Sequence, residues 1–79
     1  MSVDFSRASK VASIAEEYQH LRQQRCACGG RYRLVRQALV EDAAGRPYDR
    51  LFARCQSCGQ PLELLFDVSA FYGHHPQGL

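Results

Sequence analysis

The 79-residue sequence predicts a small α+β protein, in which an N-terminal amphipathic helix is followed by a three-stranded antiparallel sheet. Apolar residues recur at helical spacing near the N-terminus, alternate at period two in later segments, and are interrupted by two cysteine pairs at turns. A chain of this length supports one domain, whose apolar core alone is marginal. We therefore expect a single domain over residues 1–79, with a helix at about 7–25, a cysteine-bearing sheet at 26–68 and a tail at 69–79 whose end is loose.

The helix at about 7–25 is predicted from an apolar stripe on one face. The stripe consists of Val11, Ile14, Tyr18 and Leu21. This spacing is typical of a helix face that packs on a neighbouring surface. Ser6 is a suitable N-cap, and His20 lies off the stripe, facing solvent. We expect the stripe to pack on the rest of the chain, so that a monomer is favoured over a homodimer.

Three segments read as strands joined by tight turns. The first runs from about 31 to 42 and carries apolar residues on both of its faces. Asp42-Ala43-Ala44-Gly45 then favours a type I turn, in which Gly45 supplies the left-handed residue of a bulged hairpin. The return strand covers about 46–54, and Pro47 suits its start. A third strand at 61–68 alternates at period two.

Four cysteines stand in two close pairs, and each pair is followed by glycine. The pairs are Cys26 with Cys28 and Cys55 with Cys58, separated by a 26-residue spacer that has the length of one long hairpin. Two tight turns can therefore deliver four thiolates to one tetrahedral Zn²⁺. The sequence predicts one structural zinc ion, because four cysteine ligands leave no open coordination position.

This pattern resembles the zinc-ribbon family, in which two cysteine turns and antiparallel strands hold one zinc ion. The resemblance covers about residues 26–68 and implies that Cys26, Cys28, Cys55 and Cys58 are the ligands. Only Ala27 separates the first pair, where two residues are usual. The cysteine spacing also looks like the zinc switch of the bacterial redox-regulated holdase chaperone, which implies a thiol redox switch as a second alternative function.

Several function classes receive no support from the sequence. No apolar run approaches the roughly 20 residues of a membrane span, and the N-terminus has no signal-peptide core, so we expect a cytoplasmic protein without a membrane partner. No catalytic serine–histidine set, carboxylate pair or phosphate loop stands out, and we expect no enzymatic activity. His74 and His75 lie in the tail as weak candidates for a second metal.

Two classes of binding function remain open. The apolar residues on both strand faces favour a protein-interaction or regulatory module with an unidentified protein partner. Nucleic-acid binding is the alternative, because arginines interleave with aromatic residues and could meet phosphates and bases. The residues that would form this nucleic-acid site are Arg31, Arg33, Arg36, Tyr48, Arg50, Phe52 and Arg54. The formal net charge of +2 is modest for a nucleic-acid-binding protein.

Overall fold

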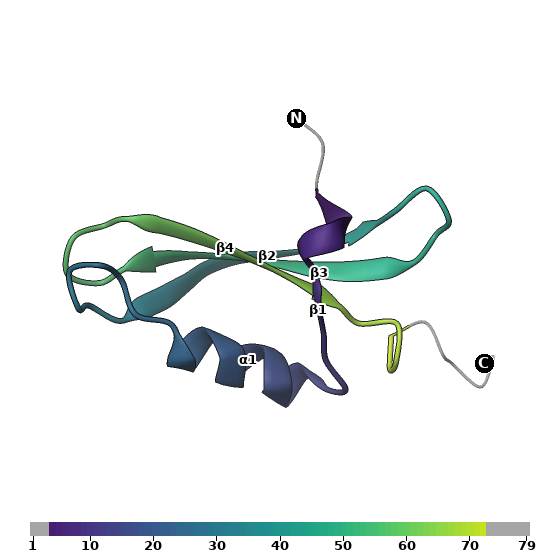
Figure 1. Cartoon of the computed structure of the whole chain (residues 1–79), viewed down its shortest axis with the longest axis horizontal. Helices are drawn as coiled ribbons and strands as arrows, with labels where there is room; N and C mark the ends of the chain where they lie inside the picture. The colour runs from purple at the N-terminus through teal and green to yellow at the C-terminus, as the bar shows by residue number, and fades with distance from the viewer. Residues whose placement is uncertain (1–3, 73–79) are drawn as a thin grey trace.

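The computed structural model describes residues 4–72, which form a four-stranded mixed sheet with an α-helix on one face (Figure 1). In chain order the elements are the 3₁₀ helix η1 (Phe5–Arg7), strand β1 (Ser9–Lys10), helix α1 (Ile14–Gln23) and strands β2 (Tyr32–Glu41), β3 (Pro47–Cys55) and β4 (Pro61–Asp67). The strand order is β1-β4-β3-β2. Strands β2, β3 and β4 are antiparallel neighbours, whereas β1 runs parallel to β4. The α+β class agrees with the sequence prediction.

The predicted three-stranded antiparallel sheet is wrong, because a short fourth strand precedes the helix. Ser9 and Lys10 pair with Phe66 and Asp67 in parallel register. The next backbone N–H, that of Val11, donates to the Asp67 carbonyl at 3.3 Å. The extended backbone carries the Val11 side chain into the core, where it is 4% exposed. A parallel pair of two residues has too little periodicity to be recognised from sequence.

The predicted helix at 7–25 is too long, because α1 covers only Ile14–Gln23 and its N-cap residue follows Ser6 by seven positions. The cap is Ser13, whose Oγ accepts a hydrogen bond from the Glu16 N–H at 3.3 Å. The Glu16 carboxylate in turn accepts from the backbone N–H that precedes the cap, at 2.7 Å. This reciprocal arrangement is close to a capping box and fixes the helix start at Ile14. Ser6 lies inside η1 instead.

The later start also changes which helical residues are buried. Leu21 is buried and Tyr18 packs at the edge of the core, as predicted, but Ile14 is 52% exposed. Glu17 takes the central position, with 1% exposure, because it lies one turn before Leu21 on the face toward the sheet. His20 is half-buried rather than fully solvent-facing, and its ring centroid lies 5.4 Å from that of Phe66.

A bulge at Val35 explains why β2 carries apolar residues on both faces. Leu34 pairs with Ala53 but Arg36 pairs with Phe52, so Val35 is the extra residue. Side chains at even positions face the helix before the bulge, and those at odd positions face it afterwards. Val35 itself is 56% exposed.

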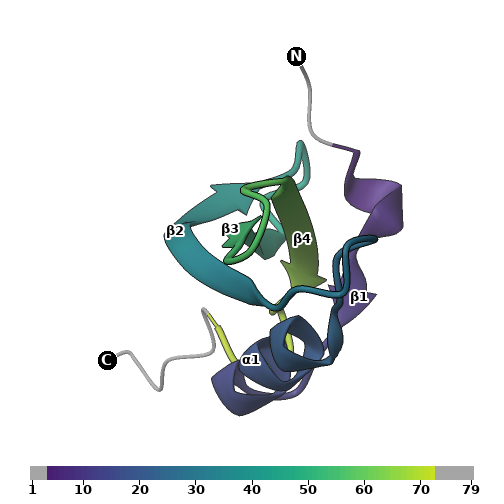
Figure 2. The ribbon, with the colours of Figure 1, turned by 90° about the vertical axis from the view of Figure 1, so that its left-hand side faces the viewer.

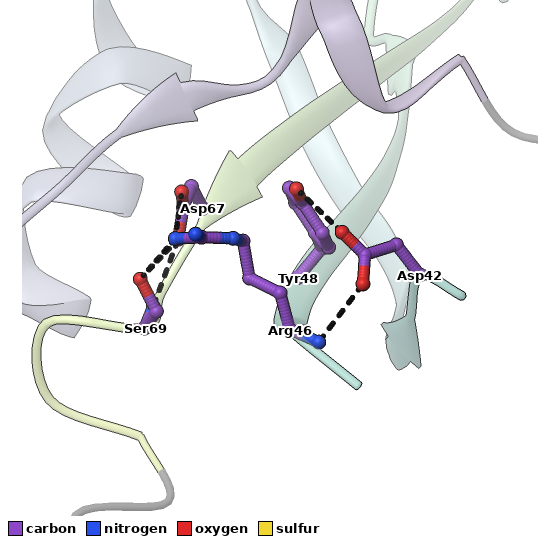
Figure 3. A network of polar contacts seen from close by, with 5 residues as sticks. All are labelled: Asp42, Arg46, Tyr48, Asp67 and Ser69. Atoms are coloured by element: carbon purple, nitrogen blue, oxygen red, sulfur yellow. Dashed lines mark hydrogen bonds and ion pairs between the residues drawn. The ribbon is translucent and has the colours of Figure 1, made fainter. Parts of the chain in front are cut away.

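The β2–β3 hairpin forms as predicted. The Gly45 N–H donates to the Asp42 carbonyl at 3.0 Å, and Gly45 has a φ of 83°. Asp42 also accepts from the Arg46 N–H at 2.9 Å and from the Tyr48 hydroxyl at 3.2 Å (Figure 3). These bonds hold the turn rigidly at the end of the sheet.

The residues after β4 are tied to the same hairpin. The Arg46 guanidinium lies 3.5 Å from the Asp67 carboxylate and donates to the Ser69 hydroxyl at 3.3 Å (Figure 3). Phe71 packs against the core, as expected for a docked start of the tail. The remaining tail, with His74 and His75, lies outside the described residues.

The core lies between α1 and the helix-side face of the sheet (Figure 2). Its buried members are Val11, Leu21, Leu51, Ala53, Phe66 and Val68. The alternation of β4 is confirmed, since Leu62, Leu64 and Phe66 all contribute to this layer. Within residues 4–72, no helix has the length and apolar character needed to cross a bilayer.

Candidate metal centre

The four cysteines lie together at one end of the sheet, on the left-hand side of Figure 1, as predicted. Their Sγ atoms all lie within 4.8 Å of one another. Two of the sulfur pairs, Cys26 with Cys58 and Cys28 with Cys55, are 3.5 Å apart. A tetrahedral site with metal–sulfur bonds of about 2.3 Å has sulfur–sulfur edges of about 3.8 Å. The cluster therefore has the dimensions of a site for one metal ion.

The first cysteine turn follows α1 directly. The Gly29 N–H donates to the Cys26 carbonyl at 2.8 Å, and the Cys26 N–H donates to the Gly30 carbonyl at 3.0 Å. Gly29 has a φ of 87°, a conformation that favours glycine. These two bonds close a tight turn although a single residue separates Cys26 from Cys28, so both sulfurs reach the same point.

The second turn joins β3 to β4 and has the same design. The Gly59 N–H donates to the Cys55 carbonyl at 2.9 Å, and the Cys55 N–H donates to the Gln60 carbonyl at 2.9 Å. The Ser57 N–H also points at the Cys55 sulfur, at 3.4 Å. Such N–H groups around a thiolate stabilise its negative charge and orient the ligand.

The two turns interlock at Gly30. A Cβ atom placed on Gly30 would lie 2.5 Å from the Cys55 Sγ and 2.8 Å from the Ser57 Oγ. Neither distance is compatible with van der Waals contact, so only glycine allows the turns to approach this closely. The sequence shows Gly30 next to Gly29 but contains no signal for this steric role.

Burial divides the four ligands into two inner and two outer ones. Cys26 and Cys55, the first residue of each turn, are 7% and 3% exposed. Cys28 and Cys58 are exposed. The candidate metal centre therefore lies at the protein surface, with two sulfur ligands buried beneath it and two exposed to solvent. A metal ion could reach it from solvent.

The surroundings of Cys55 and Cys58 shift the pKa values of these two thiols in opposite directions. The N–H of Cys58 is the main cause that lowers the pKa of Cys55 to about 6. At Cys58 the N–H of Gln60 lowers the pKa, but the other three sulfurs outweigh it and raise the pKa to about 12. Four thiolates at this spacing repel one another, and a divalent cation among them would offset that repulsion. The donor set thus fits a metal ion.

Tyr32 and the buried acids were not anticipated from the sequence. Tyr32 begins β2 beside the first cysteine turn, and its contact with Cys26 raises the pKa of the phenol. Its place at the first strand residue after the turn is the signal that could have identified it. Glu17 and Asp49 are buried acids at 1% and 6% exposure, which no sequence pattern indicated.

The arginine and aromatic residues of the predicted nucleic-acid site are partly engaged with one another. The guanidinium carbons of Arg36 and Arg50 lie 4.5 and 4.8 Å from the centre of the Phe52 ring. Arg50 also pairs with the Glu63 carboxylate at 2.7 Å. The Tyr48 ring is buried, with its centroid 4.5 Å from that of Phe5.

The remaining predicted basic residues, like Arg36, lie at the surface. Arg31, Arg33 and Arg54 are exposed, and Arg33 is the register partner of Arg54. Arg54 donates to the Gly59 carbonyl at 3.0 Å. The strands therefore bring Arg33, Arg36, Arg50 and Arg54 to the sheet face opposite α1, whereas Arg31 precedes β2 beside the metal centre.

Comparisons of the chain with protein-family models, curated proteins and solved structures found no match. The resemblance to zinc ribbons therefore rests on the cysteine spacing and on the cluster that these cysteines form. Fold and site together define a small α+β protein with a candidate four-cysteine metal centre.

Proposed function

We propose that this protein is a small structural-zinc module that acts by binding another protein. The observation that carries the metal assignment is the closed set of four sulfurs within 4.8 Å of one another. Thiolates favour zinc among the common structural metal ions, and four of them leave no coordination position for a substrate. The ion on Cys26, Cys28, Cys55 and Cys58 would hold the start of β2 and the β3–β4 connection to the end of α1.

A binding function is supported by the apolar surface that the fold leaves uncovered. Ile14, Val35, Leu39 and Tyr72 are the exposed large apolar side chains within residues 4–72, with exposures from 44% to 56%. They come from both faces of the sheet and from the helix. Exposed apolar surface that gathers into patches is typical of protein-interaction sites.

Co-purification from the native cells tests the interaction. Tagged wild-type protein and a Cys55→Ser variant would be isolated in parallel, and candidate partners reconstituted with pure components. We expect a protein partner that binds zinc-loaded wild type stoichiometrically and binds Cys55→Ser at least about tenfold more weakly, a loss of about 1.4 kcal/mol. Nucleic acid without any such protein in the isolated material would contradict the proposal.

Nucleic-acid binding is the second candidate, favoured by the four arginines on the face opposite α1. Arg36 and Arg54 line a hollow of about 570 Å³ beside Phe52. If this surface binds single-stranded nucleic acid, affinity should fall steeply with salt, because bound phosphates release counterions. Arg33→Gln should weaken binding to all sequences and lower the salt slope by about 0.7, whereas Arg22→Gln on the helix should not. A fluorescence titration without binding at micromolar protein and low salt would reject this candidate.

The thiol redox switch stays a prediction. It requires that oxidation release the metal, which a zinc-sensitive dye would report during peroxide treatment. Release that is no faster than from a non-redox four-cysteine site would reject it.

A further inference from the structure

One exposed apolar patch lies over a small cavity on the helix side of the sheet. Ile14, Leu39 and Tyr72, which are 52%, 44% and 46% exposed, come from α1, β2 and the turn after β4. They line a cavity of about 240 Å³ together with Glu17 and Asp49. We call this feature the acidic pocket, because its apolar rim surrounds two acidic residues.

The two acids of the pocket are buried and incompletely satisfied. Glu17 is 1% exposed, its carboxyl group lies against that of Asp49, and no other group of residues 4–72 forms a hydrogen bond with its oxygens. Asp49 is 6% exposed and accepts a hydrogen bond from the Gln37 amide. Gln37 in turn accepts from the Tyr18 hydroxyl at 3.2 Å, and it forms no hydrogen bond with Glu17. Two acidic groups that are buried side by side without a cation are unfavourable, because their charges cannot both be accommodated.

No basic side chain within residues 4–72 forms an ion pair with Glu17 or Asp49. The ion pairs within residues 4–72 are Arg46 with Asp67 and Arg50 with Glu63, which lie outside the pocket. Burial, with a smaller contribution from Asp49, raises the pKa of Glu17 to about 8. Near neutral pH the pocket therefore holds a proton that a stronger cation can displace.

The chemistry of the pocket favours a guanidinium group over other cations. A guanidinium is planar, donates two parallel hydrogen bonds to a carboxylate and tolerates partial desolvation better than an ammonium ion. Calcium needs six or more oxygen ligands, which two carboxyl groups and an engaged amide do not supply. The apolar rim suits the methylene stem of arginine and apolar neighbours on either side of it.

We propose that the acidic pocket binds an arginine side chain that a partner protein presents between apolar residues. This inference rests on the proposed function and names the contact through which that function would operate. The arginine would replace the proton held between Glu17 and Asp49 and pair with the two carboxylates, while Ile14, Leu39 and Tyr72 would cover the flanking apolar residues.

The test is a titration of the zinc-loaded, ¹⁵N-labelled protein with acetyl-Leu-Arg-Leu-amide, followed by amide chemical shifts. The matched peptide carries citrulline, which has the shape of arginine without its charge. We expect shifts around Ile14, Leu39 and Asp49, and at least about tenfold weaker binding of the citrulline peptide. Affinity should rise severalfold between about pH 6.5 and pH 8, because binding releases the Glu17 proton.

Two charge-removing variants distinguish binding in the acidic pocket from a general electrostatic attraction of the cationic peptide. Glu17→Gln should weaken the arginine peptide by about tenfold or more, whereas Glu41→Gln removes an exposed carboxylate outside the pocket and should change affinity less than twofold. If Glu17→Gln fails to fold, Asp49→Asn and the citrulline comparison on wild type still decide the matter. Equal binding of the two peptides, equal binding by Glu17→Gln, or no shift up to about 10 mM peptide would overturn the proposal.

The proposed function and this inference can fail separately. If a reconstituted partner binds wild type and Glu17→Gln equally, the acidic pocket is not part of the interface, but the proposed protein-binding function is still supported. The absence of any protein partner in the co-purification would instead remove the function itself.

Discussion

At the residue scale, the packing of the metal centre depends on Gly30, which has no side chain to hold the cysteines apart. Gly29 and Gly59 are needed for their positive φ angles, but open space surrounds the position where each would carry a Cβ atom. Gly30 differs because the sulfur of Cys55 lies only 2.5 Å from the position of its missing Cβ atom. The sequence shows two adjacent glycines after Cys28, and only the three-dimensional contact between the turns separates their roles.

Gly30→Ala should therefore weaken zinc binding much more than a comparable change elsewhere. The added methyl group forces Cys55 and Ser57 away, and displaced ligands cost metal affinity. We expect at least about a hundredfold loss in a competition titration against a chromophoric chelator. Gly45→Ala is the control, because it replaces a glycine of the hairpin turn whose Cβ position has no atom within 4 Å. It should lower the unfolding free energy by about 1 kcal/mol and leave zinc affinity unchanged. Equal zinc affinities for Gly30→Ala and wild type would contradict the steric role.

The raised pKa of Glu17 makes stability depend on pH in a definite direction. Between the ordinary value of 4.5 and about 8, the folded chain keeps the Glu17 proton and the unfolded chain has lost it. The free energy of unfolding therefore falls as pH rises through this window, by up to about 1.4 kcal/mol per pH unit, and levels off above it.

Glu17→Gln isolates this effect, because glutamine cannot ionise. Urea unfolding of both proteins, each loaded with zinc, would be compared from about pH 6 to pH 8.5. The difference in unfolding free energy cancels the contribution of the cysteines, and we expect the variant to gain relative to wild type as pH rises. Parallel profiles would show that the carboxyl group has an ordinary pKa.

At the element scale, the sheet was more predictable than the segment before it. The β2–β3 turn is specified by Asp42 and Gly45, whose local chemistry suits one turn type. Strand β4 is specified by its alternation. The bulge at Val35 reverses the face of β2 after its first residues, so no single alternation fits that strand. Strand β1 depends on pairing with Phe66 and Asp67, more than fifty residues away, which local pattern does not encode.

The helix boundary gives an element-scale prediction. Ser13→Ala removes the cap of α1 and should lower the unfolding free energy by about 1 kcal/mol. Ser6→Ala acts only on the single turn of η1 and should cost less than about 0.5 kcal/mol. Denaturant titrations of the two zinc-loaded variants compare them directly. A larger loss for Ser6→Ala would mean that the helix begins near residue 7 after all.

At the scale of the whole molecule, the apolar core is thin and the metal centre lies at one end of it. Residues 4–72 span 45 × 28 × 18 Å, so the sheet is covered by one helix over only part of its length. The cysteine ligands were predictable from spacing and adjacent glycines, because the chemistry of a four-thiolate site dictates both. The buried pair of Glu17 and Asp49 was not, since an acidic residue in a sequence gives no sign of the neighbours that will bury it.

We propose that one zinc ion on Cys26, Cys28, Cys55 and Cys58 holds this fold together. Structural zinc contributes about 10–16 kcal/mol of apparent binding free energy in small domains, which exceeds the total stability expected of a chain this size. Native mass spectrometry with parallel circular dichroism, before and after a strong chelator, measures stoichiometry and folding on one sample. We expect one zinc ion per chain, loss of the folded spectrum when the metal is removed, and recovery of that spectrum when zinc is added back. A metal-free chain that keeps its folded spectrum at neutral pH would contradict it.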